Sequence, residues 1–187
     1  MVRLLIGSIA GGIAQFLVGF LFWWTPLSRL AFKVADDPAN ADLQAALARN
    51  LTQHGTGTYA VPWTGTQQGT TLFGQGPVAT IHFNVHGFPV MDSAALVGAL
   101  LLAIVTAFLI ALALRAIAGR ITTLAERVRL VVLFAVAAAL YFHLGQPILH
   151  PFDWRYFLYL GVSDALGFIA AGVVIARWFL PRPTVNG

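Results

Sequence analysis

The chain has 187 residues, of which 58% are hydrophobic, only 10% are charged and none is cysteine. Roughly 25% of the residues of a soluble domain are charged, so this composition excludes an ordinary water-soluble protein and indicates a protein of a lipid bilayer. The lack of cysteine excludes disulfides and thiolate chemistry, and the formal charge of +4 does not indicate nucleic-acid binding, because the arginines stand singly or in pairs beside apolar runs.

Four apolar runs are long enough to cross a bilayer, which takes about 20 helical residues at a rise of 1.5 Å each. We therefore expect an all-α membrane protein, a four-transmembrane-helix antiparallel bundle that forms a single integral membrane domain over residues 1–187. The predicted spans are residues 4–27, 94–114, 127–146 and 156–179. The first ends in tryptophans typical of the membrane interface and is predicted to be an uncleaved anchor. The third is short unless its first turns extend back through the arginines that precede it.

The basic residues predict the orientation of these spans. With four spans, one side of the membrane receives the larger and denser group of basic residues: Arg3, Arg115, Arg120, Arg127, Arg129, Arg177 and Arg182. The positive-inside tendency then places both termini in the cytoplasm and residues 28–93 outside it. Because arginine supplies every basic residue except Lys33 and alanine is abundant, we expect a bacterial inner membrane protein.

Residues 28–93, between the first two spans, are predicted to form a small α+β extracytoplasmic loop region. Asp37 and Pro38 are typical of a helix start, and leucines recur at helical spacing from there to about Leu51. Residues 58–62 and 78–85 have the composition and alternation of strands. A short amphipathic helix and a small hairpin or sheet are therefore expected here.

Asp164 is the residue most indicative of function, because it lies inside the fourth span. An ionised carboxylate there costs on the order of 3 kcal/mol, so it is expected to face the bundle interior and to have a partner or a proton. The candidate partners are Gln15, Thr106, His143 and Ser163. Two interpretations stay open: a proton or ligand site, and a buried hydrogen bond that fixes helix register.

Gln15 lies on a stripe of the first span with Gly7, Gly11 and Gly19, at successive i+4 positions. This pattern favours a packing seam with an interhelical hydrogen bond from Gln15, and a polar pathway is the alternative. The fourth span has similar small residues, at Gly161, Ala165, Gly172 and Ala176, and is its expected partner.

Further polar residues collect just before the fourth span, where His150 and Asp153 follow His143 within a dozen residues. The residue types suit a metal, but the spacing matches no zinc motif, so an interfacial turn is favoured and no metal is predicted. The same holds for His54, His82 and His86 of the loop. No phosphate loop, nucleophile elbow or carboxylate pair is present, so neither a catalytic residue nor a cofactor is predicted.

Three short motifs carry a resemblance: the aromatic end of the first span, the segment Gly57–Pro62 with the pattern GxYxxP, and the last span from Asp164 to Gly172. Together they resemble an uncharacterised family of small bacterial four-helix inner-membrane proteins with a GxYxxP-type outer loop. The resemblance implies four helices with the loop after the first, and it implies no activity.

Two functions remain open on this sequence. The favoured one is a non-enzymatic structural, accessory or assembly component of the cell envelope. Its expected partner is the lipid bilayer, and other membrane proteins or further copies of itself are the candidates beyond it. The alternative is a small proton-coupled transporter or channel-like protein that uses Asp164. The candidate ligand or proton site comprises Asp164, His143, Gln15, His150 and Asp153.

Overall fold

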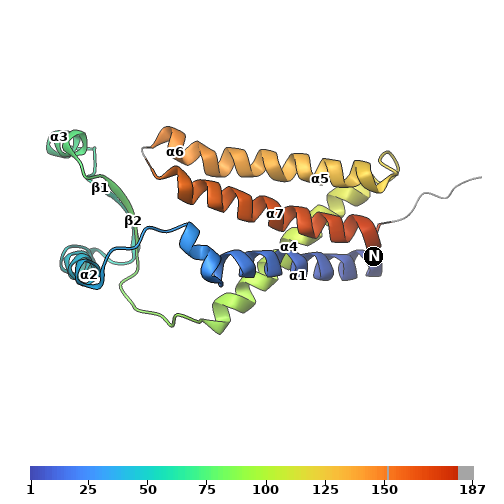
Figure 1. The fold of residues 1–187 in the computed structure, drawn as a ribbon, viewed down its shortest axis with the longest axis horizontal. Helices are drawn as coiled ribbons and strands as arrows, with labels where there is room; N and C mark the ends of the chain where they lie inside the picture. Colours follow the sequence, from blue (N-terminus) through green and yellow to red (C-terminus); the bar gives the residue numbers. More distant parts are fainter. Residues whose placement is uncertain (151, 181–187) are drawn as a thin grey trace, which may run out of the picture. The chain divides into compact units, whose positions relative to one another are not determined.

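The computed structural model describes residues 1–150 and 152–180, and these are mostly helical. They divide into two compact units: a helical unit, made of Met1–Lys33 and the described residues from Ser93 onward, and an inserted unit, Val34–Asp92. Four helical segments of the first unit are long and apolar enough to cross a membrane: Val2–Trp23, Ser93–Ala116, Leu124–Leu149 and Trp154–Trp178 (Figure 1). The prediction of four spans is confirmed as far as the number, length and apolar composition of the helices are concerned.

The first span, α1 (Val2–Trp23), ends four residues earlier than predicted. A 3₁₀ helix, η1 (Pro26–Leu30), follows it, and the Thr25 hydroxyl oxygen accepts a hydrogen bond from the Leu27 backbone N–H. Thr25 is extended because the proline ring after it disfavours the helical conformation at that position. The predicted helix end at residue 27 is therefore wrong, and Pro26 is the physical reason.

The third span is longer than predicted at both ends. It begins with α5 (Leu124–Ala139), whose first turn is closed by a capping box between Thr123 and Glu126, so the helix starts before the arginines. It continues through a π-helical turn, η3 (Leu140–Leu144), and a short helix, α6 (Gly145–Leu149). The helical path thus passes Pro147, where the sequence predicted an end.

The helical unit is held together by small residues. Helix α1 packs against α4 (Ser93–Ala116) and α7 (Trp154–Trp178), and α5 packs against α7. A Cβ atom on Gly11 would lie 3.0 Å from the Ile175 side chain, and one on Gly7 would lie 2.7 Å from that of Phe179. The predicted seam between the first and fourth spans is confirmed at these glycines, but Gly19 has no neighbour within 4 Å and is not part of it.

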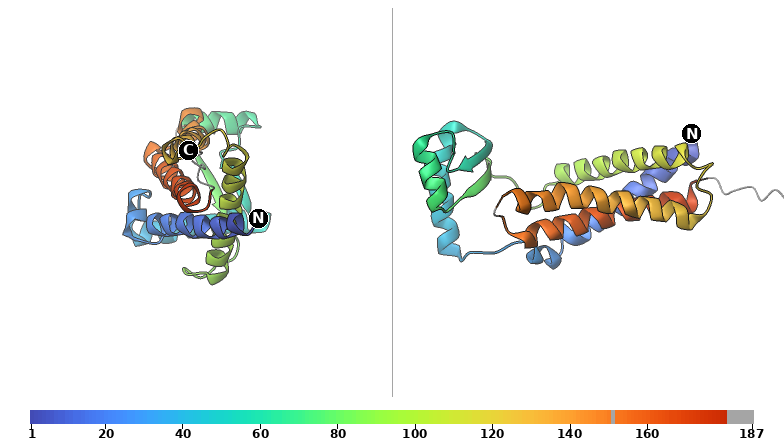
Figure 2. Two further views of the ribbon diagram at one scale, coloured as in Figure 1. Left: turned by 90° about the vertical axis from the view of Figure 1, so that its right-hand side faces the viewer. Right: turned by 90° about the horizontal axis from the view of Figure 1, so that it is seen from above.

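Helices α1 and α4 cross near the middle of each, where Gly12 lies against Ile104, and they pack together on one side of this crossing. The buried residues of α1 lie between Leu4 and Gly12, and those of α4 lie between Ala103 and Leu114. Both sets belong to the end of the unit that carries the N-terminus, and the two helices diverge toward the other end (Figures 1 and 2). The diverging halves leave space beside α7.

The inserted unit contains a two-stranded sheet and two helices. Strands β1 (Gly57–Val61) and β2 (Ala79–Phe83) pair antiparallel, with Gly57 opposite Phe83. The predicted helix is present as α2 (Asp37–Leu51), with the Asp36 carboxylate accepting from the Ala39 N–H. The helix between the strands, α3 (Gln67–Gln75), was not predicted, because its glycines and threonines resemble a loop. Its capping residue is Thr66, which accepts from the Gly69 N–H.

Candidate functional site

The structure brings two of the predicted site residues into direct contact. The Nε2 atom of His143 lies 2.8 Å from Oδ2 of Asp164. Asp164 is ten residues into α7, about 15 Å along the axis from Trp154, and thus well inside the apolar helix. Of the candidate partners, His143 is the one bonded to the carboxylate.

The π turn η3 presents His143 to α7. The buried positions of α5 recur every four residues, at Arg127, Val131, Ala135 and Ala139, and His143 and the buried Pro147 continue the series. In a regular α-helix, residues four positions apart are rotated by about 40° around the axis, so such a stripe gradually turns away from its neighbour. A π turn has more residues per turn, and it rotates the next residue of the series, His143, back toward α7. Pro147 has no N–H for the carbonyl of His143, so the regular helical bond is missing just where the turn widens.

Gly161 on the facing helix lies against His143, at a distance that an alanine would also tolerate. A Cβ atom on Gly161 of α7 would lie 3.7 Å from the Cβ of His143. Gly161 precedes Asp164 by three residues, so both lie on one face of α7. The predicted small residue of the fourth span therefore contacts the candidate site.

A cavity of about 470 Å³ lies beside this pair, where α1 and α4 diverge. Such a volume lies within the range of about 300–1,000 Å³ that is typical of ligand sites. Asp164 lines the cavity, and its side chain remains 44% exposed, against 20% for His143. The carboxylate is therefore accessible from the cavity, and the imidazole lies behind it.

The other predicted partners of Asp164 line the same cavity but have separate roles. The Oε1 atom of Gln15 is buried and accepts no hydrogen bond from the described residues. The Thr106 hydroxyl donates to the Leu102 carbonyl oxygen of its own helix at 2.9 Å. The Ser163 hydroxyl oxygen accepts from the indole N–H of Trp23 at 3.2 Å. The predicted interhelical hydrogen bond of Gln15 is not found at Oε1.

Aromatic rings form much of the remaining wall. They come from α1, the residue that follows it, and α7: Phe16, Phe20, Trp23, Trp24 and Phe168. The rings of Phe20 and Trp24 are stacked, with centroids 6.1 Å apart, and Trp23 meets the Tyr159 ring edge to face. The cavity thus combines one carboxylate with a mostly aromatic surface.

His150 and Asp153 lie outside this cavity. The His150 ring stacks on Phe152, with centroids 5.1 Å apart. Asp153 caps α7, accepting from the Arg155 N–H at 3.1 Å, and forms an ion pair with Lys33 at 3.3 Å. The Arg155 N–H, and after it Lys33, lower the pKa of the Asp153 carboxyl below its usual value. These contacts give Asp153 a structural role.

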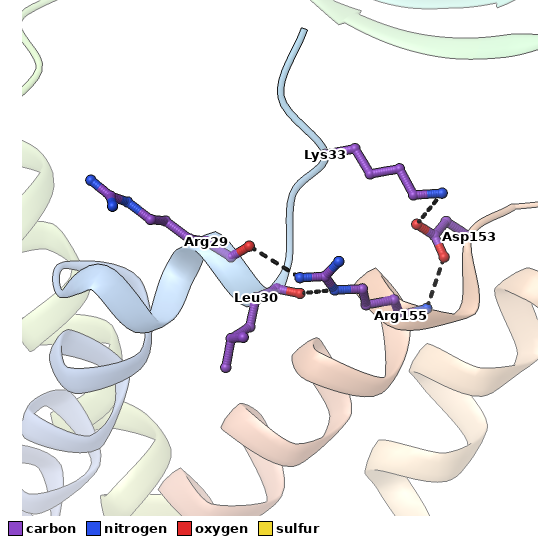
Figure 3. A network of polar contacts seen from close by, with 5 residues as sticks. All are labelled: Arg29, Leu30, Lys33, Asp153 and Arg155. Carbon is purple, nitrogen blue, oxygen red and sulfur yellow. Dashed lines mark hydrogen bonds and ion pairs between the residues drawn. The ribbon is translucent and has the colours of Figure 1, made fainter.

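The turn that contains Asp153 and Arg155 also joins α7 to the segment after α1. The Arg155 guanidinium donates to the carbonyl oxygens of Leu30 and Arg29 (Figure 3). Together with the pair Lys33–Asp153 this forms a polar network that holds the end of η1 against the first turn of α7. The sequence predicted a turn here whose tryptophan, tyrosine and arginine anchor the helix ends, and Arg155 makes such a contact; the position of the turn at the membrane interface stays a prediction.

The histidines of the inserted unit are engaged in local contacts. The His82 Nδ1 atom lies 3.1 Å from the Thr58 hydroxyl on the paired strand, and the His86 backbone N–H donates to Asn84. Within residues 1–150 and 152–180, no three side chains of histidine, aspartate or glutamate are close enough to hold a metal ion.

Comparison with known proteins gives no relative: no family model, no curated protein and no solved structure matches the chain. The resemblance to the four-helix family with the GxYxxP-type loop therefore stays a prediction.

Sequence reasoning missed two parts of the site. The aromatic wall had a signal, since Phe16, Phe20 and Trp24 recur every four residues on α1, but this spacing is also typical of a helix in lipid. The π turn had only an indirect signal, namely Pro147 four residues after His143. Chemically, the assembled site can exchange a proton between a carboxyl and an imidazole beside a space large enough for a small molecule.

Proposed function

We propose that the protein is a multi-pass protein of the bacterial inner membrane. Its four apolar helices form an antiparallel bundle with both termini in the cytoplasm, and the inserted unit Val34–Asp92 lies outside. The distribution of the basic residues supports this orientation, because seven arginines fall on the cytoplasmic face of such a bundle.

Within that membrane, the protein acts as a small non-enzymatic carrier that couples the movement of a solute to that of a proton. The observation that carries this proposal is the contact of 2.8 Å between His143 and Asp164 beside a cavity of about 470 Å³. Ionisable side chains within membrane-spanning helices carry a high free-energy cost. Where they occur, they typically mark a proton or solute pathway. The cavity supplies the solute with a place next to that pair.

The chemistry follows from the two groups. The pair has two relevant states. In the protonated state it is either an uncharged carboxyl beside a neutral imidazole or an imidazolium beside a carboxylate, and its net charge is zero. When that proton leaves, the pair carries one negative charge. A solute that binds one of these forms better than the other is thereby linked to the proton, because each shifts the equilibrium of the other.

Four spans enclose little room, so the carrier is proposed to work as an assembly of copies. The half of α4 that diverges from α1, from Ser93 to Leu102, has no buried residue. This half is proposed as the surface that packs against a second copy in the membrane.

The test is a flux measurement in proteoliposomes that contain a pH-sensitive dye. Three solutes share one apolar group and differ in the head: 3-phenylpropylammonium, 3-phenylpropanol and 4-phenylbutanoate. We expect one of them to move protons across wild-type vesicles faster than across vesicles with Asp164→Asn, which have the same passive leak. The variant Asp153→Asn, the same change at the residue that caps α7 outside the cavity, should behave as wild type. Equal rates in wild type and Asp164→Asn for all three solutes would contradict carriage.

A second candidate is an accessory or assembly component of the envelope. The observation in its favour is a set of exposed large apolar residues in the inserted unit: Trp63, Phe88, Val90 and Met91. Exposed apolar side chains on a soluble part suit a protein partner or the membrane surface. Purification in mild detergent separates the two functions, because an accessory protein should elute with a partner in fixed stoichiometry.

A further inference from the structure

The cavity beside Asp164 allows the solute to be specified by its chemistry, on the basis of the carrier function proposed above. Among the residues that line the cavity, Asp164 is the one that can carry a formal charge, and no lysine or arginine faces it there. Among the described residues, the titratable groups in contact with the cavity-lining side chains are His143 from η3, which is hydrogen-bonded to Asp164, and Tyr159 on α7, which meets Trp23 and whose hydroxyl donates to the Phe22 carbonyl oxygen. The electrostatic character of the cavity is therefore negative or neutral.

Three side chains of the cavity, Gln15, Thr106 and Asp164, offer acceptor oxygens to a ligand. The Oε1 atom of Gln15 is buried without a donor, and Oδ1 of Asp164 has no donor among the described residues. The Thr106 hydroxyl has already given its proton to Leu102, which leaves only its lone pairs. Of these atoms only Oε1 of Gln15 is buried, and an acceptor that is buried without a donor is unfavourable, so a ligand that donates to it is stabilised.

The aromatic wall favours the same kind of ligand. The faces of tryptophan and phenylalanine attract a cation electrostatically, and the interaction is stronger where water is excluded. The rings of Phe20, Trp23 and Trp24 also offer apolar surface to a hydrocarbon tail. One wall thus suits both parts of an amphiphilic cation.

We propose that the cavity between α1, α4 and α7 binds a lipophilic ammonium ion, with the ammonium group on Asp164, Gln15 and Thr106 and the apolar tail against the aromatic wall. A primary ammonium has three N–H donors, one for each of these acceptors. The ammonium also replaces the proton of the pair His143–Asp164, since either cation neutralises the same negative charge. Solute and proton therefore compete, which is the linkage that a coupled carrier requires.

The binding test uses the purified full chain in detergent and calorimetric titration with 3-phenylpropylammonium and 3-phenylpropanol. We expect saturable binding of the ammonium, at least tenfold tighter than that of the alcohol. Asp164→Asn should weaken ammonium binding at least tenfold and leave alcohol binding unchanged, and Asp153→Asn should change neither. Acidification should weaken binding of the ammonium and not that of the alcohol.

Two further variants keep the test decisive if Asp164→Asn does not fold. Gln15→Met retains the length of the side chain and removes the acceptor, and Thr106→Val does the same for the hydroxyl. Each should weaken ammonium binding several-fold. Equal affinity for ammonium and alcohol, or ammonium binding that none of the three cavity variants weakens, overturns the proposal.

The outcome is separable from that of the carrier function. If the ammonium binds as expected but no solute moves protons in proteoliposomes, the cation site stands and the carrier function fails. If 4-phenylbutanoate or the alcohol moves protons in an Asp164-dependent way and the ammonium does not bind, the carrier function stands and the cation site is wrong.

Discussion

Gly12 of α1 and Ile104 of α4 meet without room for a side chain between them: a Cβ atom on Gly12 would lie 2.5 Å from the Cα of Ile104. The neighbouring backbone cannot move as a side chain could, so Gly12→Ala must push the two helices apart. We expect a loss of about 1–3 kcal/mol in stability, measured as thermal unfolding in detergent. Gly19→Ala is the control, because nothing lies within 4 Å of its Cβ position. A Gly12→Ala protein as stable as Gly19→Ala would contradict this packing.

A double-mutant cycle should detect the contact between His143 and Asp164. With single variants His143→Gln and Asp164→Asn and the double variant, the coupling free energy is expected to be about 1–2 kcal/mol, because the hydrogen bond is charge-assisted and only partly exposed. Thermal or denaturant unfolding in one detergent gives the four values. Strict additivity of the two single changes would mean that the contact contributes nothing, although both residues would still line or adjoin the cavity.

The number of helices long enough to cross a membrane could be predicted from the sequence, whereas their ends were decided by local chemistry that apolar composition does not report. Residues 25–27 are uncharged like the span before them, yet Pro26 ends α1 at Trp23. Conversely, Arg127 and Arg129 reduce the apolar character of α5, yet the capping box at Thr123 starts the helix ahead of them. Composition therefore located the spans, and caps and prolines fixed their limits.

The candidate site was predictable only as far as single residues could indicate it. An aspartate inside an apolar helix requires a partner, and that rule pointed to His143 among four candidates. It could not select His143, because the choice depends on the π turn that presents the imidazole to α7. Nor could it separate Asp153 from the site, since the contact of Asp153 with Lys33 joins segments that are 120 positions apart in the chain.

Asp153 should make stability depend on pH in the acid range. Its carboxyl pKa is lowered below the usual value of 3.8, chiefly by the Arg155 N–H and then by Lys33. The stabilisation is therefore complete above pH 3.8 and disappears as the pH falls through the lower pKa of the folded state. Asp153→Asn keeps a capping side chain but loses the ion pair. Its unfolding temperature should lie below that of the wild type at pH 7, and the difference should shrink when both are measured well below pH 3.8.

The absence of cysteine makes the proposed orientation directly testable by single-cysteine labelling. Gly74 of α3 and Gly119 of the turn after α4 both have open space at the Cβ position, so Gly74→Cys and Gly119→Cys should fold as the wild type does. If the inserted unit is extracytoplasmic, a membrane-impermeant maleimide should label Gly74→Cys in intact spheroplasts and Gly119→Cys only after lysis. The reverse pattern would place the arginine-rich turn outside, which would invert the bundle and also the direction from which a solute reaches Asp164.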